Sequence, residues 1–251
     1  MDDPYVPLLS NLAYPTGLII SPESVKKHGK DVGRNPAGTG PHQFREWKRN
    51  QHVILDQNGS YWDGQAGLKS VVFRLITDAN SRVTEILSGG IDMWVEVPPD
   101  NVATFYSNSS YAPHEQTGPY LSFLILKEGP LQDIRVRQGL NYAINKQALV
   151  ENVLQNTATV ASGPTPVTFS WAYNDALQPC LYDPSKAREL VKAAVAEDAT
   201  LTFYVTEGGS RMLDPVPMGT AIQADLKAIG LYVKIETCEC NTFLDKVNPG
   251  V

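Results

Sequence analysis

The residue type best suited to holding a charged ligand is an arginine in the loop TEGGSRMLDPVPMG, at residues 206–219. This residue, Arg211, directly follows a predicted strand, and loops at the carboxyl ends of parallel strands are where α/β folds place ligands. A guanidinium group can hold a carboxylate through two parallel hydrogen bonds. Arg211 therefore either binds a carboxylate or is a solvated loop arginine, and the sequence leaves both interpretations open.

Aromatic side chains form the second group of candidates. Tyr120 and Phe123 lie in the apolar run at residues 120–126, which predicts a buried strand. Aromatic groups at a boundary between two lobes commonly line a ligand cleft. Ordinary packing in a core is the alternative. The predicted ligand-binding residues are Arg211, Tyr120, Phe123 and Thr117.

No combination of residues indicates catalysis or a metal site. The sequence contains no G-x-S-x-G, H-E-x-x-H, phosphate-loop or dinucleotide-binding motif. Asp92 and Glu96 lie four residues apart on a predicted strand, which favours surface or hinge groups over a catalytic pair. The histidines do not pair at i, i+4 on a common helix: His28, His42, His52 and His114. We predict no catalytic residue, no metal and no cofactor.

The three cysteines are too few for a disulfide framework. Cys238 and Cys240 lie two residues apart on a predicted strand and would point to the same side of it, while Cys180 is distant in sequence. This spacing is not that of a zinc site. We expect structural thiols, and a pairing of two of them in an exported protein stays open.

The bulk composition is that of a globular protein of 251 residues, with 42% hydrophobic and 19% charged residues. Lys and Arg number 21 against 27 Asp and Glu, so the net charge is -6 and no nucleic-acid partner is expected. No apolar run is long enough to span a bilayer. The first residues, MDDPYVPLLS, are acidic and proline-containing, unlike a signal peptide. A cytoplasmic protein and a fragment whose leader lies upstream are both compatible with this start.

Hydrophobic periodicity predicts two regions of different character. In the first region, Ser21 and Pro22 predict a helix start, with serine as the cap and proline at the first helical position. The rest of this region is rich in β-structure: an antiparallel meander of strands at 43–48, 53–56 and 70–76, then a helix capped by Asp78 and a strand at 91–97. From Gly129 onward the pattern becomes α/β, with helices capped by Asp133, Asn145 and Asp183. A strand at 201–206, a helix at 219–229 and a strand at 231–236 predict a parallel βαβ unit.

Several motifs in the same order along the chain resemble those of the family 5 extracellular solute-binding proteins of bacterial ABC importers. The motifs are PLQDIRVRQGLNYAINKQALVENV, PAGTGPHQF, NGSYWDG, ITDANSRVTEILSGGIDM, YDPSKARELV and AIQADLKAIGLYVKIE. Each motif alone is weakly specific, whereas together they cover nearly the whole chain.

The resemblance implies an α/β fold of the type II periplasmic-binding-protein kind, two-lobed, incomplete, with mixed sheets flanked by helices. Residues 1–118 would be part of lobe I, residues 119–127 a crossover or hinge strand, and residues 128–251 part of lobe II. The lobes would close on a peptide held between them, and the closed form would engage a membrane permease. The resemblance further implies a monomer that is periplasmic or extracellular and membrane-associated, such as a lipoprotein.

Alternative functions on the same scaffold are a nickel-chelate or haem receptor and the ligand-sensing domain of a transcription regulator; an enzyme ranks after these. Members of the family are about twice as long, so we expect both ends to be missing and the isolated chain to bind no peptide. Arg211 falls where dipeptide-type members hold a ligand carboxylate, with a shorter spacing to the next helix. Ile125 stands where the crossover strand of the family usually ends in asparagine.

Overall fold

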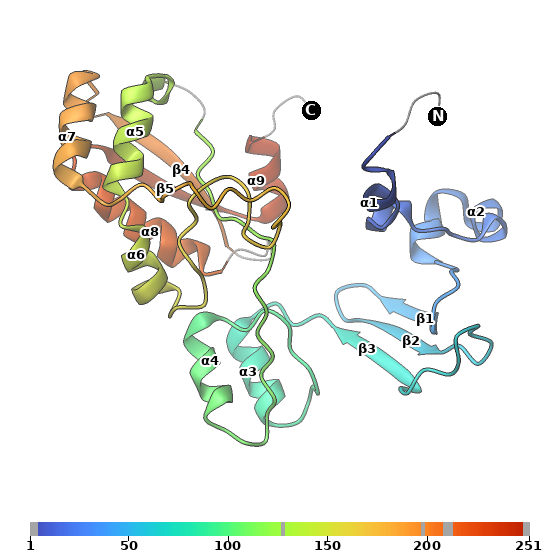
Figure 1. Cartoon of the computed structure of the whole chain (residues 1–251). Helices are drawn as coiled ribbons and strands as arrows, with labels where there is room; N and C mark the ends of the chain where they lie inside the picture. The colour runs from blue at the N-terminus through green and yellow to red at the C-terminus, as the bar shows by residue number, and fades with distance from the viewer. Residues whose placement is uncertain (1–4, 127–128, 197–198, 208–212, 248–251) are drawn as a thin grey trace. The chain divides into compact units, whose positions relative to one another are not determined.

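The structure, a computed structural model, describes residues 5–126, 129–196, 199–207 and 213–247 (Figure 1). Arg211 lies outside these ranges, as does Lys127 at the end of the predicted crossover strand. The chain forms two compact units, Met1–Ile91 and Asp92–Val251. Helices and strands are both present, so the predicted α/β class is confirmed.

The first unit begins with short helices: α1 (Leu8–Leu12), a 3-10 turn at Pro15–Gly17, α2 (Pro22–His28) and a 3-10 segment at Gly29–Arg34. Ser21 caps α2, because its hydroxyl accepts a hydrogen bond from the Ser24 amide, and Pro22 occupies the first helical position. Both features of this helix start are as the sequence predicts.

Three antiparallel strands follow, in the order β1 (His42–Lys48), β2 (His52–Gln57) and β3 (Ser70–Arg74), which confirms the predicted meander. Cross-strand pairing places apolar side chains on one face of this sheet. The residues of that face are Phe44, Trp47, Val53, Leu55, Val71 and Phe73. None of them is buried, and Ser24 is the only buried residue among the described residues of the first unit.

Helix α3 (Ala79–Leu87) closes the first unit. Asp78 caps it as predicted, with its carboxylate accepting a hydrogen bond of 2.7 Å from the Ser81 amide. Arg74 at the end of β3 donates to Glu85 at 2.6 Å and to the Gly90 carbonyl at 2.7 Å. These contacts attach the helix to the end of the sheet.

The predicted strand at 91–97 is wrong, because this segment is irregular. Glu96 has a φ of 65°, a left-handed conformation that interrupts an extended chain. Trp94 packs edge-to-face on Phe105 of α4 (Pro99–Tyr106), and Phe105 packs in the same way on Tyr111. Packing on these aromatic rings, rather than pairing with another strand, fixes the segment.

The predicted buried strand at 120–126 is also wrong. The segment pairs with no strand in the described part of the chain, and Phe123 is 72% exposed. Leu124 and Leu126 nevertheless pack against the core of the second unit. The alternation of apolar residues thus places one side of the segment on the core, but a strand also needs a hydrogen-bonding neighbour.

The second unit holds the hydrophobic core. A 3-10 turn at Gly129–Gln132 leads into α5 (Ile134–Ala143), and α6 (Lys146–Ala148) continues as a π-helical turn at Leu149–Val153. After a proline-rich loop, α7 (Pro184–Ala193) packs along α5 (Figure 1). Asp133, Asn145 and Asp183 each cap the following helix through the side chain, as predicted.

The βαβ unit is confirmed: β4 (Thr200–Thr206) and β5 (Tyr232–Cys238) pair in parallel, and α8 (Pro215–Lys227) connects them. Helix α8 begins at Pro215, earlier than predicted. Helix α9 (Cys240–Val247) follows β5. The expectation that Cys238 and Cys240 lie on one strand is therefore wrong, because Cys240 is the first residue of a helix. The buried core residues are Val136, Leu140, Ala143, Ile144, Leu149, Ala187, Val191, Ala196, Ile222, Leu226, Ile229 and Leu231.

Candidate functional site

The predicted ligand-binding residues lie on two segments. Thr117, Tyr120 and Phe123 are exposed on the irregular segment that precedes Leu124, and the Tyr120 side chain is 58% exposed. The ring of Tyr120 lies close to Gly118. Arg211 is outside the described residues, so its role stays a prediction. Neither of the two cavities described below is lined by Thr117, Tyr120 or Phe123.

The structure describes both flanks of the loop that carries Arg211. Thr206 ends β4, and Asp214 directly precedes α8 in a left-handed conformation with a φ of 38°. Burial raises the pKa of Asp214, and the negative charge of Asp100 raises it further. The loop therefore runs from the carboxyl end of a parallel strand to a helix start, which is where an α/β fold presents groups to a ligand.

A cavity of about 400 Å³ opens between α5, α7 and the loop before α7. Its lining residues are Gln138, Asn141, Tyr142, Cys180, Lys186 and Leu190. The Lys186 ammonium donates a 2.8 Å hydrogen bond to the Tyr142 hydroxyl and lies 4.2 Å from the centre of that ring. The hydrogen bond to Tyr142 raises the pKa of Lys186. These contacts hold the lysine against α5 and account for its position without a ligand.

A second cavity, of about 450 Å³, lies where β3 meets α3 in the first unit. Arg74, Asp78 and Glu85 line it together with Ile76, Asn80, Ser81 and Thr84. The hydrogen bond and charge of Arg74 lower the pKa of Glu85, so this carboxylate is ionised at neutral pH. The charged groups of this cavity are thus engaged with one another, and Asp78 is engaged in capping α3.

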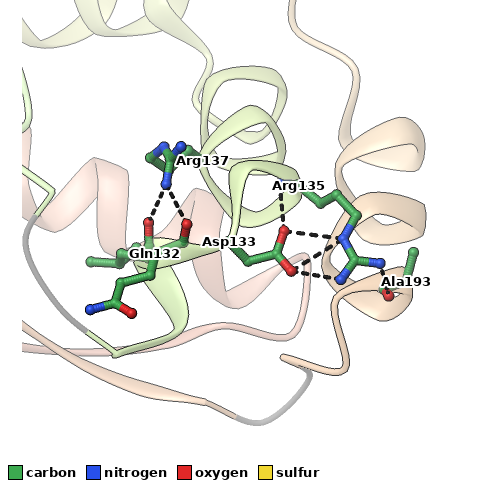
Figure 2. Close-up of polar contacts among 6 residues, drawn as sticks. Gln132, Asp133, Arg135, Arg137 and Ala193 are labelled. Carbon is green, nitrogen blue, oxygen red and sulfur yellow. Dashed lines mark hydrogen bonds and ion pairs between the residues drawn. The ribbon is translucent and has the colours of Figure 1, made fainter.

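A connected polar cluster lies at the start of α5 (Figure 2). The Asp133 carboxylate accepts hydrogen bonds from the Arg135 guanidinium at 2.6, 3.1 and 3.2 Å, and it caps the helix through the Arg135 amide at 2.8 Å. Arg135 also donates to the Ala193 carbonyl at 2.6 Å. The hydrogen bonds with Arg135 lower the pKa of Asp133 to about 2.

Arg137 completes this cluster from the next turn of α5. Its guanidinium donates to the Leu131 carbonyl at 2.9 Å and to the Gln132 carbonyl at 2.6 Å (Figure 2). Sequence reasoning identified Asp133 as a cap but missed both arginines. Their spacing from the cap could not have identified these contacts, because both arginines bond to backbone carbonyls, which any residue type carries.

The histidines, acidic residues and cysteines considered in the sequence are the remaining candidates. Among the described residues, no three His, Cys, Asp or Glu side chains gather in a way that could hold a metal ion. His52 is engaged with Glu46 at 2.6 Å, and Asp92 and Glu96 are exposed on an irregular segment rather than a strand. Cys180, Cys238 and Cys240 are free thiols. No helix in the described ranges is long and apolar enough to cross a membrane.

Comparisons with known proteins agree with the resemblance of the motifs. The glutathione-binding protein GsiB of Salmonella choleraesuis is 34% identical over 239 residues, covering 94% of this chain and 46% of that protein. The dipeptide-binding protein of Escherichia coli is 30% identical over 257 residues, covering 98% and 48%. This chain therefore spans about half the length of the curated relatives it matches.

A solved structure also resembles this chain over about half of its own length. The periplasmic binding protein DppA from Helicobacter pylori, in complex with the peptide STSA, matches with a TM-score of 0.86 and 28% identity, covering 98% of this chain and 48% of DppA. This match confirms the predicted type II periplasmic-binding-protein fold over part of its length. The family model for the middle region of the solute-binding proteins matches residues 1–250. The chain thus belongs to the bacterial extracellular solute-binding proteins, family 5.

Proposed function

We propose that this chain is part of the substrate-binding component of an ABC-type importer, and that its solute is a di- or oligopeptide. The observation that carries the proposal is the match at a TM-score of 0.86 to a binding protein solved with a peptide. The names of the curated relatives, glutathione-binding and dipeptide-binding protein, support the same class of solute.

Arg211 is the proposed partner of the peptide carboxylate. The loop that carries it begins at the carboxyl end of β4 and ends at the start of α8, which supports a role in binding. Thr117, Tyr120 and Phe123 are the proposed contacts from the other side of the ligand, and all three residues are exposed. Aromatic rings can pack on peptide side chains of many kinds.

In this proposal the protein acts by closing and performs no chemistry. Residues 1–118 belong to lobe I, residues 119–127 form the crossover segment and residues 128–251 belong to lobe II. Ligand binding shifts the population from open to closed forms. The chain is therefore a binding protein rather than an enzyme and needs no cofactor.

The partner of the closed form is a permease in the membrane. We propose a monomeric protein, located in the periplasm or outside the cell and associated with the membrane. The family description, extracellular solute-binding proteins, supports this location.

Uptake of a labelled dipeptide by the source organism tests the proposal. We expect deletion of the gene to abolish uptake and the unaltered gene to restore it. Arg211→Ala should lower uptake about tenfold or more at limiting peptide, since a lost charge-assisted hydrogen bond costs roughly 1.5–3 kcal/mol.

Arg188→Ala is the matched control, because Arg188 is an exposed arginine of the same unit that donates to the Ala228 carbonyl. Its uptake should equal that of the unaltered protein. Uptake that persists after deletion would contradict peptide import. If deletion of the gene abolishes uptake but the Arg211→Ala protein restores it fully, only the role of Arg211 would be contradicted.

A further inference from the structure

Asn58 connects the loop after β2 to the segment that precedes β1. Its backbone amide donates to the Pro41 carbonyl at 2.9 Å, and its side-chain amide donates to the Gly40 carbonyl at 3.0 Å. Its side-chain oxygen accepts hydrogen bonds from the Gln43 side chain at 2.9 Å and from the Ser60 amide at 3.1 Å. These contacts of a single residue, here called the Asn58 latch, hold the two segments together.

Gly59, the next residue, is a glycine that the fold does not require. Its φ lies outside the left-handed range that favours glycine, and a Cβ atom there would meet no atom within 4 Å. The residue is exposed, and its amide donates to no backbone carbonyl of the described residues. The nitrogen of Gly59 is therefore open to approach, and a small side chain could be added at this position without strain.

Asparagine followed by glycine places an electrophile and a nucleophile on neighbouring residues. The backbone nitrogen of Gly59 can attack the Cγ atom of Asn58, which forms a cyclic succinimide; the side-chain nitrogen leaves as ammonia and takes the proton of the attacking nitrogen. Water then adds to either ring carbonyl, the C–N bond at that carbon breaks, and the ring nitrogen regains a proton. The product is aspartate or isoaspartate, and the only co-reactant is water.

Either product disrupts the Asn58 latch. Aspartate lacks the N–H donor for the Gly40 carbonyl and brings a negative charge close to that oxygen. Isoaspartate also adds a methylene group to the backbone, which displaces the Ser60 amide from its acceptor. Modification thus releases the segment before β1 from the loop after β2.

The latch also controls the reaction. While the side-chain oxygen and nitrogen of Asn58 are held by hydrogen bonds, its Cγ atom is not free to turn towards the nitrogen of Gly59. Little apolar burial supports these contacts, because Ser24 is the only buried residue among the described residues of the first unit. Regions with few buried contacts open locally at low cost, so the latch opens far more often than the core of the second unit.

We propose that Asn58 and Gly59 form a self-modification site, at which opening of the Asn58 latch permits succinimide formation and the product keeps the latch open. The reacting groups belong to the chain itself. The proposal is therefore independent of the solute and of the proposed role in import.

Peptide mass spectrometry of the 251-residue protein, incubated in mildly alkaline buffer, measures conversion of the Asn58 amide to a carboxylate. Asn108 is an internal reference, because its side-chain oxygen also accepts from the amide two residues on, at 3.0 Å, but serine follows it. We expect conversion at Asn58 before Asn108. Gly59→Ala should slow conversion at Asn58 about fivefold or more, since alanine reaches the ring-closing conformation less easily than glycine.

Gln43→Ala tests control by the latch. It removes a donor to the Asn58 oxygen, so conversion at Asn58 should become about threefold faster or more. Gln51→Ala, at an exposed position of the same unit, is the matched control and should leave the rate unaltered. Conversion of Asn108 without conversion of Asn58, or an unaltered Asn58 rate in Gly59→Ala, would overturn the site. An unaltered rate in Gln43→Ala would overturn control by the latch.

Hydrogen exchange tests the effect of the product. In Asn58→Asp, the backbone amide of residue 58, which donates to the Pro41 carbonyl, should exchange about tenfold faster or more. Asn108→Asp is the control and should leave this amide unaltered. If Asn58→Asp does not fold, unaltered protein incubated until Asn58 is converted should show the same increase. Unaltered exchange in both samples would overturn release of the segment before β1.

Discussion

At the residue scale, Val195 adopts an unusual conformation. It follows α7 with a φ of 54°, its amide donates to the Lys192 carbonyl, and the Ala196 amide donates to the Val191 carbonyl. This is the pattern of hydrogen bonds by which helices end on a left-handed residue, usually glycine. Val195 is 92% exposed, so no packing compensates for the strain of a β-branched residue there.

We expect Val195→Gly to stabilise the protein. Relief of a left-handed non-glycine residue gains roughly 1–3 kcal/mol, and the greater freedom of glycine in the unfolded chain offsets about 0.5–1 kcal/mol. The free energy of unfolding in urea should rise by about 1 kcal/mol. Ala193→Gly, at the last residue of α7, is the control and should lower it, by less than the roughly 1 kcal/mol that glycine costs in a helix interior. A decrease for Val195→Gly would show that the strain is not present.

The carboxylate of Asp133 should make the stability of the fold depend on pH. Its pKa is lowered from 3.8 to about 2 by hydrogen bonds with Arg135, so folding favours the ionised form. The resulting stability is fully present above pH 4 and is lost as the pH falls from about 4 to 2. Asp133→Asn should therefore be less stable than the unaltered protein at pH 6, and this difference should shrink towards pH 2.

Urea unfolding between pH 2 and pH 6 measures this difference. Asp63→Asn, in an exposed loop of the first unit, is the control and should leave the free energy of unfolding at pH 6 within about 0.5 kcal/mol of the unaltered value. A constant deficit for Asp133→Asn across the range would mean that the loss comes from the geometry of the cap and not from its charge.

At the element scale, the sequence predicts helix starts more reliably than strands. The caps at Ser21, Asp78, Asp133, Asn145 and Asp183 are all present, because a cap bonds to an amide two or three residues away. The strands predicted at 91–97 and 120–126 are absent, because a strand depends on a partner distant in sequence. Apolar alternation indicates which side is buried but not whether a neighbour exists.

In the candidate site, too, the sequence predicts features set by neighbouring residues but not those that depend on a partner distant in sequence. The loop that carries Arg211 could be located from the sequence, since strand and helix patterns define its two ends. The contacts of Arg135 and Arg137 could not be assigned, because both side chains bond to backbone carbonyls, which every residue carries. Only the fold determines which carbonyl lies within reach of a guanidinium.

The packing of α8 on β4 depends on a glycine. A Cβ atom at Gly219 would lie 3.0 Å from a methyl group of Val205 and 3.7 Å from the ring of Phe203. Gly219→Val should therefore force helix and strand apart and lower the free energy of unfolding by about 2 kcal/mol. Thr220→Val, at the next and exposed position, should change it by less than about 0.5 kcal/mol. Equal values for the two variants in urea unfolding would contradict this account.

At the scale of the whole molecule, the apolar core is distributed unevenly. Every buried residue of the core cluster lies between Val136 and Leu231, in the second unit. The apolar face of the β1–β3 sheet carries no buried residue. Since burial of apolar surface is the main source of stability, the two units should differ in the free energy needed to open them.

We therefore expect the first unit to open before the second. Amides of β2 are paired on both sides, with β1 and β3, whereas β4 is paired only with β5. Hydrogen bonding alone would therefore favour slower exchange in β2, and the comparison uses the β4 amides that bond to β5. Because only the second unit has a buried core, β2 amides should exchange at least about a hundredfold faster than β4 amides in native-state hydrogen exchange. Limited proteolysis should likewise cleave within residues 5–91 before it cleaves within α5 or α7. Equal exchange in β2 and β4, or first cleavage in α5 or α7, would mean that the two units unfold together.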